Sequence, residues 1–112
     1  MSFKDRKSTR AESDQFISYR AYDSSNRVCD EGMAKTRDIS RTGVSVENRR
    51  SLEVGARVEL TIALIEDIVK TEGVVRNVKK VDDQTFYIGL EFTGISEDEL
   101  NKLSKEFPNL IE

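Results

Sequence analysis

Two short patterns in this chain combine side chains that recognise purine rings and phosphate. Asp38, Ser40 and Gly43 form the pattern DxSxxG, and Arg6 and Arg10 form the pattern RxxxR near the amino terminus. A carboxylate can accept hydrogen bonds from the N1-H and the exocyclic amine of guanine, while an arginine can grip the O6/N7 edge or a phosphate in bidentate fashion. This chemistry is typical of a binding site for a guanine nucleotide.

The two patterns differ in how much their spacing alone indicates. With ten Arg in 112 residues, roughly one RxxxR pair is expected by chance, and the chain holds a second pair, Arg37 and Arg41. The DxSxxG pattern is rarer, because nine Asp, eleven Ser and six Gly give roughly 0.05 accidental matches in a chain of this length. By itself, DxSxxG also suits an Asx or Ser turn between two strands, and charged residues at a chain end are ordinarily solvated. The occurrence of both patterns together favours ligand binding.

The order of the patterns, RxxxR in an amino-terminal arm and then DxSxxG after a strand, resembles the PilZ domain family. The segment 87–92, Tyr-Ile-Gly-Leu-Glu-Phe, is similar to the last strand of that family, and a short helix that begins with acidic residues follows it. The resemblance therefore covers nearly the whole chain. PilZ domains are receptors for cyclic di-GMP, so the resemblance implies a bacterial receptor for this second messenger that signals by conformational change in motility, biofilm or polysaccharide control.

The chemistry of the ligand assigns a role to each motif residue. Arg6 and Arg10 would stack on guanine or fork onto phosphate, which Lys cannot do in the same geometry. Asp38 would take the Watson-Crick edge, Ser40 would hydrogen-bond the base or hold the loop, and Gly43 would let the loop turn with a positive φ. Two lesser candidates for the same ligand follow from the resemblance and from position, Lys7 and Arg76.

Positive charge is concentrated where these patterns lie. The chain carries a net charge of -3, yet segments 1–11 and 35–50 are each +3, and segments 12–34, 51–95 and 96–112 are each -3. Local field governs the steering of a small anion more than the overall charge does. The two basic segments contain the RxxxR and DxSxxG patterns, which is consistent with a dianionic ligand.

Composition excludes several classes of protein. A chain of 112 residues with 37% apolar content has room for one domain, and its single cysteine, Cys29, excludes an internal disulfide framework. The sequence has no long apolar run and no histidine, Cys/His cluster or phosphate-binding glycine loop. We therefore expect a cytoplasmic protein that is not an enzyme and holds no metal or cofactor.

Alternation of apolar and polar residues dominates the middle of the chain. It predicts strands over 16–22, 33–39, 44–47, 57–64, 69–78 and 86–92, separated by turns at 24–26, 53–55 and 82–84. Ser96 and Glu99 form a capping box, and Leu100, Leu103 and Phe107 line one face of a helix that should stop near Phe107, before Pro108. This spacing suits an all-β fold, an antiparallel meander or barrel with a carboxy-terminal α-helix, and the resemblance to PilZ domains implies a small antiparallel six-stranded barrel of Greek-key type. Its parts would be a flexible arm at 1–11, the barrel at 12–95 and the capping helix at 96–112.

Two alternatives to a nucleotide receptor stay open at this stage. A small β-barrel can bind single-stranded nucleic acid with basic grooves and stacking aromatic residues. The Phe and Tyr residues of this chain mostly lie in alternating strands, as core residues do, and the acidic segments would repel a long polyanion. The other alternative is a PilZ-like protein-protein module that does not need nucleotide. The sequence identifies neither the downstream protein partner nor the choice between a monomer and a ligand-dependent dimer.

Overall fold

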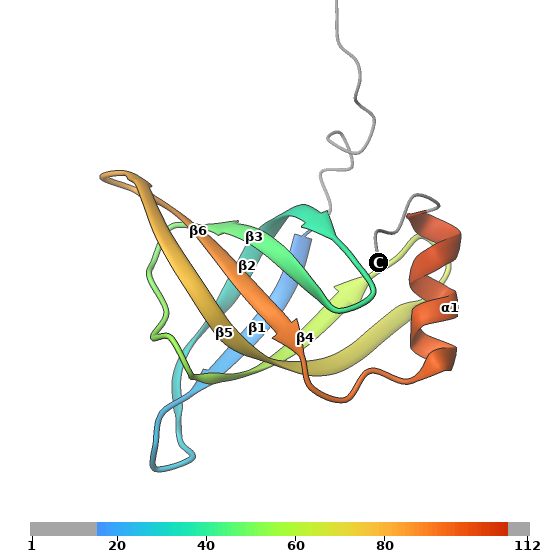
Figure 1. Ribbon diagram of the computed structural model, residues 1–112, viewed down its shortest axis with the longest axis horizontal. Helices are drawn as coiled ribbons and strands as arrows, with labels where there is room; N and C mark the ends of the chain where they lie inside the picture. The colour runs from blue at the N-terminus through green and yellow to red at the C-terminus, as the bar shows by residue number, and fades with distance from the viewer. Residues whose placement is uncertain (1–15, 108–112) are drawn as a thin grey trace, which may run out of the picture.

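The computed structural model describes residues 16–107, which form six strands and one helix (Figure 1). In chain order these are β1 (Phe16–Tyr22), β2 (Val28–Ile39), β3 (Gly43–Asn48), β4 (Arg57–Ala63), β5 (Ile68–Asp82), β6 (Thr85–Phe92) and α1 (Glu97–Glu106). All neighbouring strands are antiparallel, and the order β1-β2-β3-β6-β5-β4 closes into a barrel. The predicted fold class, an antiparallel six-stranded barrel with a carboxy-terminal helix, is confirmed.

Side chains that point inward fill the barrel. In β4, Val58, Leu60 and Ile62 are buried and alternate with more exposed neighbours, because successive side chains of a strand point to opposite faces. They join one core cluster to which all six strands contribute. The void among these inward side chains is only about 10 Å³, far smaller than a nucleotide. A ligand of that size would therefore have to bind on the outside of the barrel.

Strand β2 begins earlier than the sequence predicts, at Val28 instead of Met33. Its first residues show no clean alternation of apolar and polar side chains, because they are exposed or only partly buried and do not contribute to the core. Backbone pairing with β1 holds them in place. The hairpin turn before them is set by Asp23, whose carboxylate accepts hydrogen bonds from the backbone N-H of Arg27, and by Asn26, which has a φ of 64°.

A β-bulge interrupts the pairing of β2 with β3. Thr36 pairs with Val46 and Asp38 pairs with Ser45, so Arg37 is the extra residue. A bulge of this kind can present two consecutive side chains on one face of the sheet. Here Arg37 and Asp38 are both exposed, between the buried Thr36 and Ile39.

A similar bulge interrupts the pairing of β5 with β6. Val75 pairs with Leu90 and Asn77 pairs with Gly89, which leaves Arg76 as the extra residue. Arg76 and Asn77 are both exposed, directly after the buried Val75. Each bulge therefore adds an arginine and a second polar side chain to the outer surface.

Helix α1 begins and ends where the sequence predicts. Ser96 is the N-cap, and it forms a reciprocal capping box with Glu99. Leu103 from the helix belongs to the same core cluster as the barrel residues, and Phe107, the C-cap, packs partly against that cluster. Burying this apolar face fixes the helix to the barrel.

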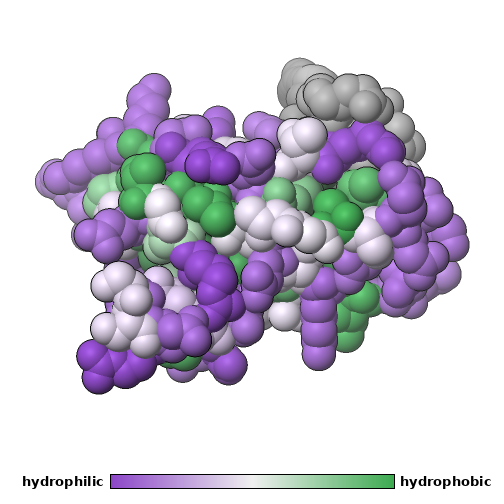
Figure 2. Space-filling view, turned by 60° about the horizontal axis from the view of Figure 1, so that its bottom comes forward, coloured by the Kyte–Doolittle hydropathy of each residue, from purple (hydrophilic) through white to green (hydrophobic). Residues whose placement is uncertain are grey.

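The surface is mainly polar. On the face shown in Figure 2, apolar side chains occur in separate small groups among hydrophilic ones. Single exposed apolar residues are ordinary on soluble domains. Within residues 16–107 no helix is long and apolar enough to cross a membrane.

Candidate functional site

The DxSxxG segment forms the end of β2, a short loop and the start of β3. Asp38 is the next-to-last residue of β2 and is exposed. Among the described residues, no hydrogen bond or ion pair involves its carboxylate. A carboxylate in such a position is available to a ligand, since nothing else in the described part of the chain uses its acceptor capacity.

Ser40 holds the loop together. Its backbone N-H donates to the carbonyl oxygen of Gly43 at 2.8 Å. Its Oγ accepts from the backbone N-H of Thr42 and from that of Gly43, each at 3.2 Å. The sequence suggested two roles for Ser40, a hydrogen bond to the base or support of the loop. The contacts of its hydroxyl fit the second role. A rigid loop keeps the neighbouring Asp38 in a fixed position.

Gly43 is needed for a reason different from the one expected. The predicted positive φ at Gly43 was wrong. Among the described glycines, only Gly55 has a positive φ, of 96°. A Cβ placed on Gly43 would lie 2.2 Å from the backbone oxygen of Leu90. The loop thus requires glycine because β3 and β6 approach too closely for any side chain.

Four paired positions run side by side across the outer face of the barrel at this loop. Asp38 of β2 is opposite Ser45 of β3, Ser45 is opposite Gly89 of β6, and Gly89 is opposite Asn77 of β5. A Cβ on Gly89 would lie 2.7 Å from the Oδ1 of Asn77. The side-chain amide of Asn77 therefore lies over Gly89, in the space that a side chain at position 89 would occupy.

An open hollow of about 200 Å³ lies over this row. We call it the motif hollow, and its lining is Asp38, Ser40, Thr42, Gly43, Val44, Ser45, Arg76, Asn77, Gly89, Leu90 and Glu91. The fold thus brings Arg76, a lesser candidate from the sequence, to the same hollow as the three motif residues. The Nε of Arg76 forms an ion pair with the Oε1 of Glu91.

Sequence reasoning missed several residues of this surface. Ser45, Asn77 and Glu91 line the hollow, and none of them was a candidate. At its edge, the guanidinium of Arg37 lies over the ring of Tyr87, 3.6 Å from its centroid. A signal did exist in the sequence, since the adjacent polar pairs Arg37-Asp38 and Arg76-Asn77 break the alternation of their strands, as bulges do.

The arm residues Arg6, Lys7 and Arg10 lie outside the described residues. Within the described part, Arg41 of the loop contacts the amino-terminal end of α1 through Glu97, with Nη2 and Oε2 3.6 Å apart. The two arginines of the second RxxxR pair therefore contact different residues: Arg37 contacts Tyr87 and Arg41 contacts Glu97.

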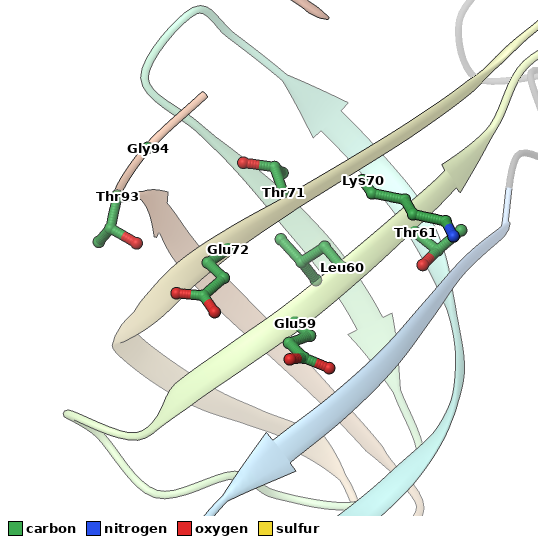
Figure 3. A pocket seen from close by; sticks show the side chains of 8 residues that line it. All are labelled: Glu59, Leu60, Thr61, Lys70, Thr71, Glu72, Thr93 and Gly94. Carbon is green, nitrogen blue, oxygen red and sulfur yellow. The ribbon is translucent and has the colours of Figure 1, made fainter. Parts of the chain in front are cut away.

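A larger hollow of about 450 Å³ lies elsewhere on the barrel, over β4 and β5 (Figure 3). We call it the acidic hollow, and its lining is Glu59, Leu60, Thr61, Lys70, Thr71, Glu72, Thr93 and Gly94. Glu59 and Glu72 are directly opposite each other on the two strands. Two facing carboxylates disfavour an anionic ligand, and none of the motif residues lines this hollow.

Neither hollow offers a metal centre. Between residues 16 and 107, no three His, Cys, Asp or Glu side chains are grouped so that they could hold a metal ion. The chemistry of the motif hollow is that of two carboxylates, hydroxyls, an amide and an arginine, groups that form hydrogen bonds with bases and phosphates.

Comparison with known proteins connects this site to a family. The family model described as PilZ domain matches residues 4–106. Two solved structures of K. pneumonia MrkH have the same fold. The apo state gives a TM-score of 0.64 at 19% identity over 96% of this chain and 53% of that one. The P2(1) crystal gives a TM-score of 0.63 at 19% identity over 96% of this chain and 51% of that one. The chain therefore spans about half the length of these MrkH chains.

Among curated proteins, none matches this chain. The family model nevertheless covers almost all of the sequence, including both patterns and the carboxy-terminal helix, and the barrel agrees with it. The chain belongs to the PilZ domain family.

Proposed function

We propose that this chain is a receptor for cyclic di-GMP that binds the nucleotide between its amino-terminal arm and the motif hollow. The observation that carries the proposal is the exposed carboxylate of Asp38, which has no partner among the described residues and lies in a hollow formed by a PilZ domain motif. PilZ domains are binding modules for this ligand, and the proposed activity is binding without catalysis.

Each side of the hollow has a role in the proposal. Asp38 accepts the N1-H and the exocyclic amine of one guanine. Ser40 fixes the loop that carries Asp38. Gly43 keeps β3 and β6 close together beneath the ligand. Arg76, already beside the hollow, can turn from Glu91 to a phosphate, since a charge-assisted bidentate contact is stronger than an exposed ion pair.

The arm supplies the remaining positive charge. In the proposal, Arg6 and Arg10 contact guanine and phosphate, with Lys7 adding charge beside them. Closure of the arm over the nucleotide converts the concentration of the second messenger into a new surface for a downstream protein. The processes that such a surface would control are motility, biofilm formation or polysaccharide production in a bacterial cytoplasm.

Calorimetric titration of the whole chain with cyclic di-GMP tests the proposal. We expect micromolar or tighter binding that competing RNA does not reduce and that cyclic di-AMP does not reproduce, because adenine lacks the N1-H and the 2-amino group from which Asp38 would accept. Displacement by single-stranded RNA would instead favour a nucleic-acid-binding barrel. Absence of any binding would overturn the proposal and leave a protein-protein module.

A further inference from the structure

The second RxxxR pair, Arg37 and Arg41, is the motif that the proposed site does not use. The fold separates its two members, since Arg41 contacts α1 through Glu97 while Arg37 lies over Tyr87. Arg37 is exposed and immediately precedes Asp38. Its position beside the carboxylate raises the question of what its guanidinium contacts.

The bulge in β2 decides where Arg37 points. In a regular strand, neighbouring side chains lie on opposite faces, and Arg37 would point away from the face that carries Asp38. Because Arg37 is the extra residue of the bulge, both side chains are on the outer face. The Nη1 of Arg37 donates to the Oγ of Ser45 at 3.2 Å, and Ser45 lines the motif hollow. The guanidinium is therefore at the edge of the hollow.

Tyr87 holds the guanidinium flat. The Cζ of Arg37 lies 3.6 Å from the ring centroid of Tyr87, which is a stacking distance. Tyr87 is half-buried on β6, so its ring has a fixed orientation set by the barrel. With one face on the ring and one nitrogen bonded to Ser45, the guanidinium has lost most of its conformational freedom before any ligand arrives.

We propose that Arg37 on Tyr87 is a base-stacking platform, and that a guanine ring of the ligand lies on the face of the Arg37 guanidinium that is turned away from Tyr87. The inference rests on the proposed function and adds a contact to it. A purine held at its Watson-Crick edge by Asp38 lies beside the neighbouring residue, Arg37. Its ring then forms the third layer of a stack over guanidinium and tyrosine. Arg37 contacts the base, and Tyr87 is a positioning residue that acts through Arg37.

Stacking on an arginine face requires a planar cation, which separates this proposal from simple charge attraction. A lysine at position 37 would keep the positive charge but could not present a flat face. A phenylalanine at position 87 would keep the ring, whereas a leucine would keep only apolar volume. These differences allow the roles of charge, plane and packing to be measured separately.

Affinity for cyclic di-GMP, measured by calorimetry on the whole chain, tests the platform. We expect R37A and R37K each to weaken binding about tenfold. Y87L should weaken binding about threefold to fivefold, and Y87F should bind as the wild type does. The matched control is R20A, which removes an exposed arginine that pairs with Glu31 on β1 and β2, away from the hollow. It should leave the affinity unchanged.

The outcomes separate the platform from the proposed function. If the wild type binds cyclic di-GMP and R37K binds equally well, Arg37 acts only through charge and the platform is wrong while the receptor stands. Equal weakening by Y87F and Y87L would also overturn the stack, because the ring would then not be what matters. If the wild type does not bind, the receptor and the platform fail together. Thermal melts of R37K and Y87F, the two most conservative variants, check that folding is retained.

Discussion

Two of the hollows on the outside of the barrel show that volume and chemistry can point to different places. The acidic hollow has about 450 Å³ and the motif hollow about 200 Å³. In the larger one, the carboxylates of Glu59 and Glu72 come from facing positions on adjacent strands (Figure 3). Arg57 neutralises them in part, with its Nη1 2.9 Å from Glu72 and 4.0 Å from Glu59. That arginine is already used in a structural contact.

The motif hollow also has two carboxylates, Asp38 and Glu91, but they are not at facing positions, and Glu91 pairs with Arg76. Its carboxylate at Asp38 has no partner among the described residues, while the arginines at its edge lie on exposed bulges. Like charges facing each other in the acidic hollow repel an anion, whereas separated donors and acceptors can bind one. The two hollows therefore differ in how their charged groups are paired, a difference that volume alone does not show.

The largest loss of affinity for cyclic di-GMP should come from a substitution in the amino-terminal arm, and a substitution in the acidic hollow should have little effect. We expect Arg10→Ala to weaken cyclic di-GMP binding at least 100-fold, a loss of about 3 kcal/mol, since a bidentate contact to phosphate or guanine is removed. Lys70→Ala, which removes the lysine of the acidic hollow, should change the affinity little. Both are measured by calorimetry. A large fall in the melting temperature of Arg10→Ala would mean that Arg10 is structural.

Glycine substitutions compare the two hollows in the absence of ligand. A Cβ at Gly43 would lie 2.2 Å from the backbone oxygen of Leu90, whereas one at Gly94 of the acidic hollow would have no neighbour within 4 Å. We expect Gly43→Ala to lower stability by about 2 to 3 kcal/mol, or the melting temperature by roughly 10 to 20 °C. Gly94→Ala should be nearly neutral. Similar melts for the two variants would contradict the close approach of β3 and β6.

The carboxylates provide the next comparison. We expect Asp38→Ala to weaken cyclic di-GMP binding about 30-fold, or about 2 kcal/mol, by removing the acceptor for the guanine edge. Glu59→Ala in the acidic hollow should leave the affinity unchanged or slightly improved. Titration of both variants and the wild type gives the result. Equal affinity of the wild type for cyclic di-AMP would count against this role for Asp38.

The smallest effect is expected at Asp82, which lines neither hollow. The backbone N-H of Gln84, 2.9 Å from the Oδ1 of Asp82, lowers the pKa of this carboxyl below its ordinary value of 3.8, with help from the side chain of Thr85. A lowered pKa in the folded state adds stability that is present above about pH 4 and is lost as the pH falls through the folded value.

Urea unfolding of the wild type and Asp82→Asn at pH 7 and pH 3 measures this contribution. The gap between the two proteins should be narrower at pH 3 than at pH 7, because the stability that the lowered pKa adds begins to be lost below about pH 4. A gap of the same size at both pH values would show that ionisation of Asp82 does not contribute. Because Asp82 is at the end of β5 and does not line the motif hollow, the Asp82→Asn substitution should leave the affinity for cyclic di-GMP unchanged.

Local patterns were sufficient to predict most of the fold. Strand β1 matches its predicted bounds, Phe16–Tyr22, because side chains there alternate cleanly between core and solvent. The helix cap at Ser96 was predictable, since the capping box involves only residues within one turn. The early part of β2 was missed because its residues lie beyond the core and are held by backbone pairing, which leaves no hydrophobic pattern.

In the candidate site, too, the sequence indicated which residues matter but not the contacts between strands that explain them. Asp38, Ser40 and Gly43 could be identified from their spacing, but the reason for Gly43 could not, since the atom that excludes a Cβ belongs to Leu90 on another strand. Arg37 gave no sign of its contact with Tyr87 for the same reason.

The sequence by itself determined the alternation that forms the strands, the capped helix and the motif residues, because each depends on neighbours along the chain. Only the tertiary structure decided that β3 lies between β2 and β6. That arrangement pairs Ser45 with both Asp38 and Gly89 and places Arg37 over Tyr87. Such contacts arise from closure of the barrel and from the shift that a bulge introduces in the register, and both join residues that are distant in the chain.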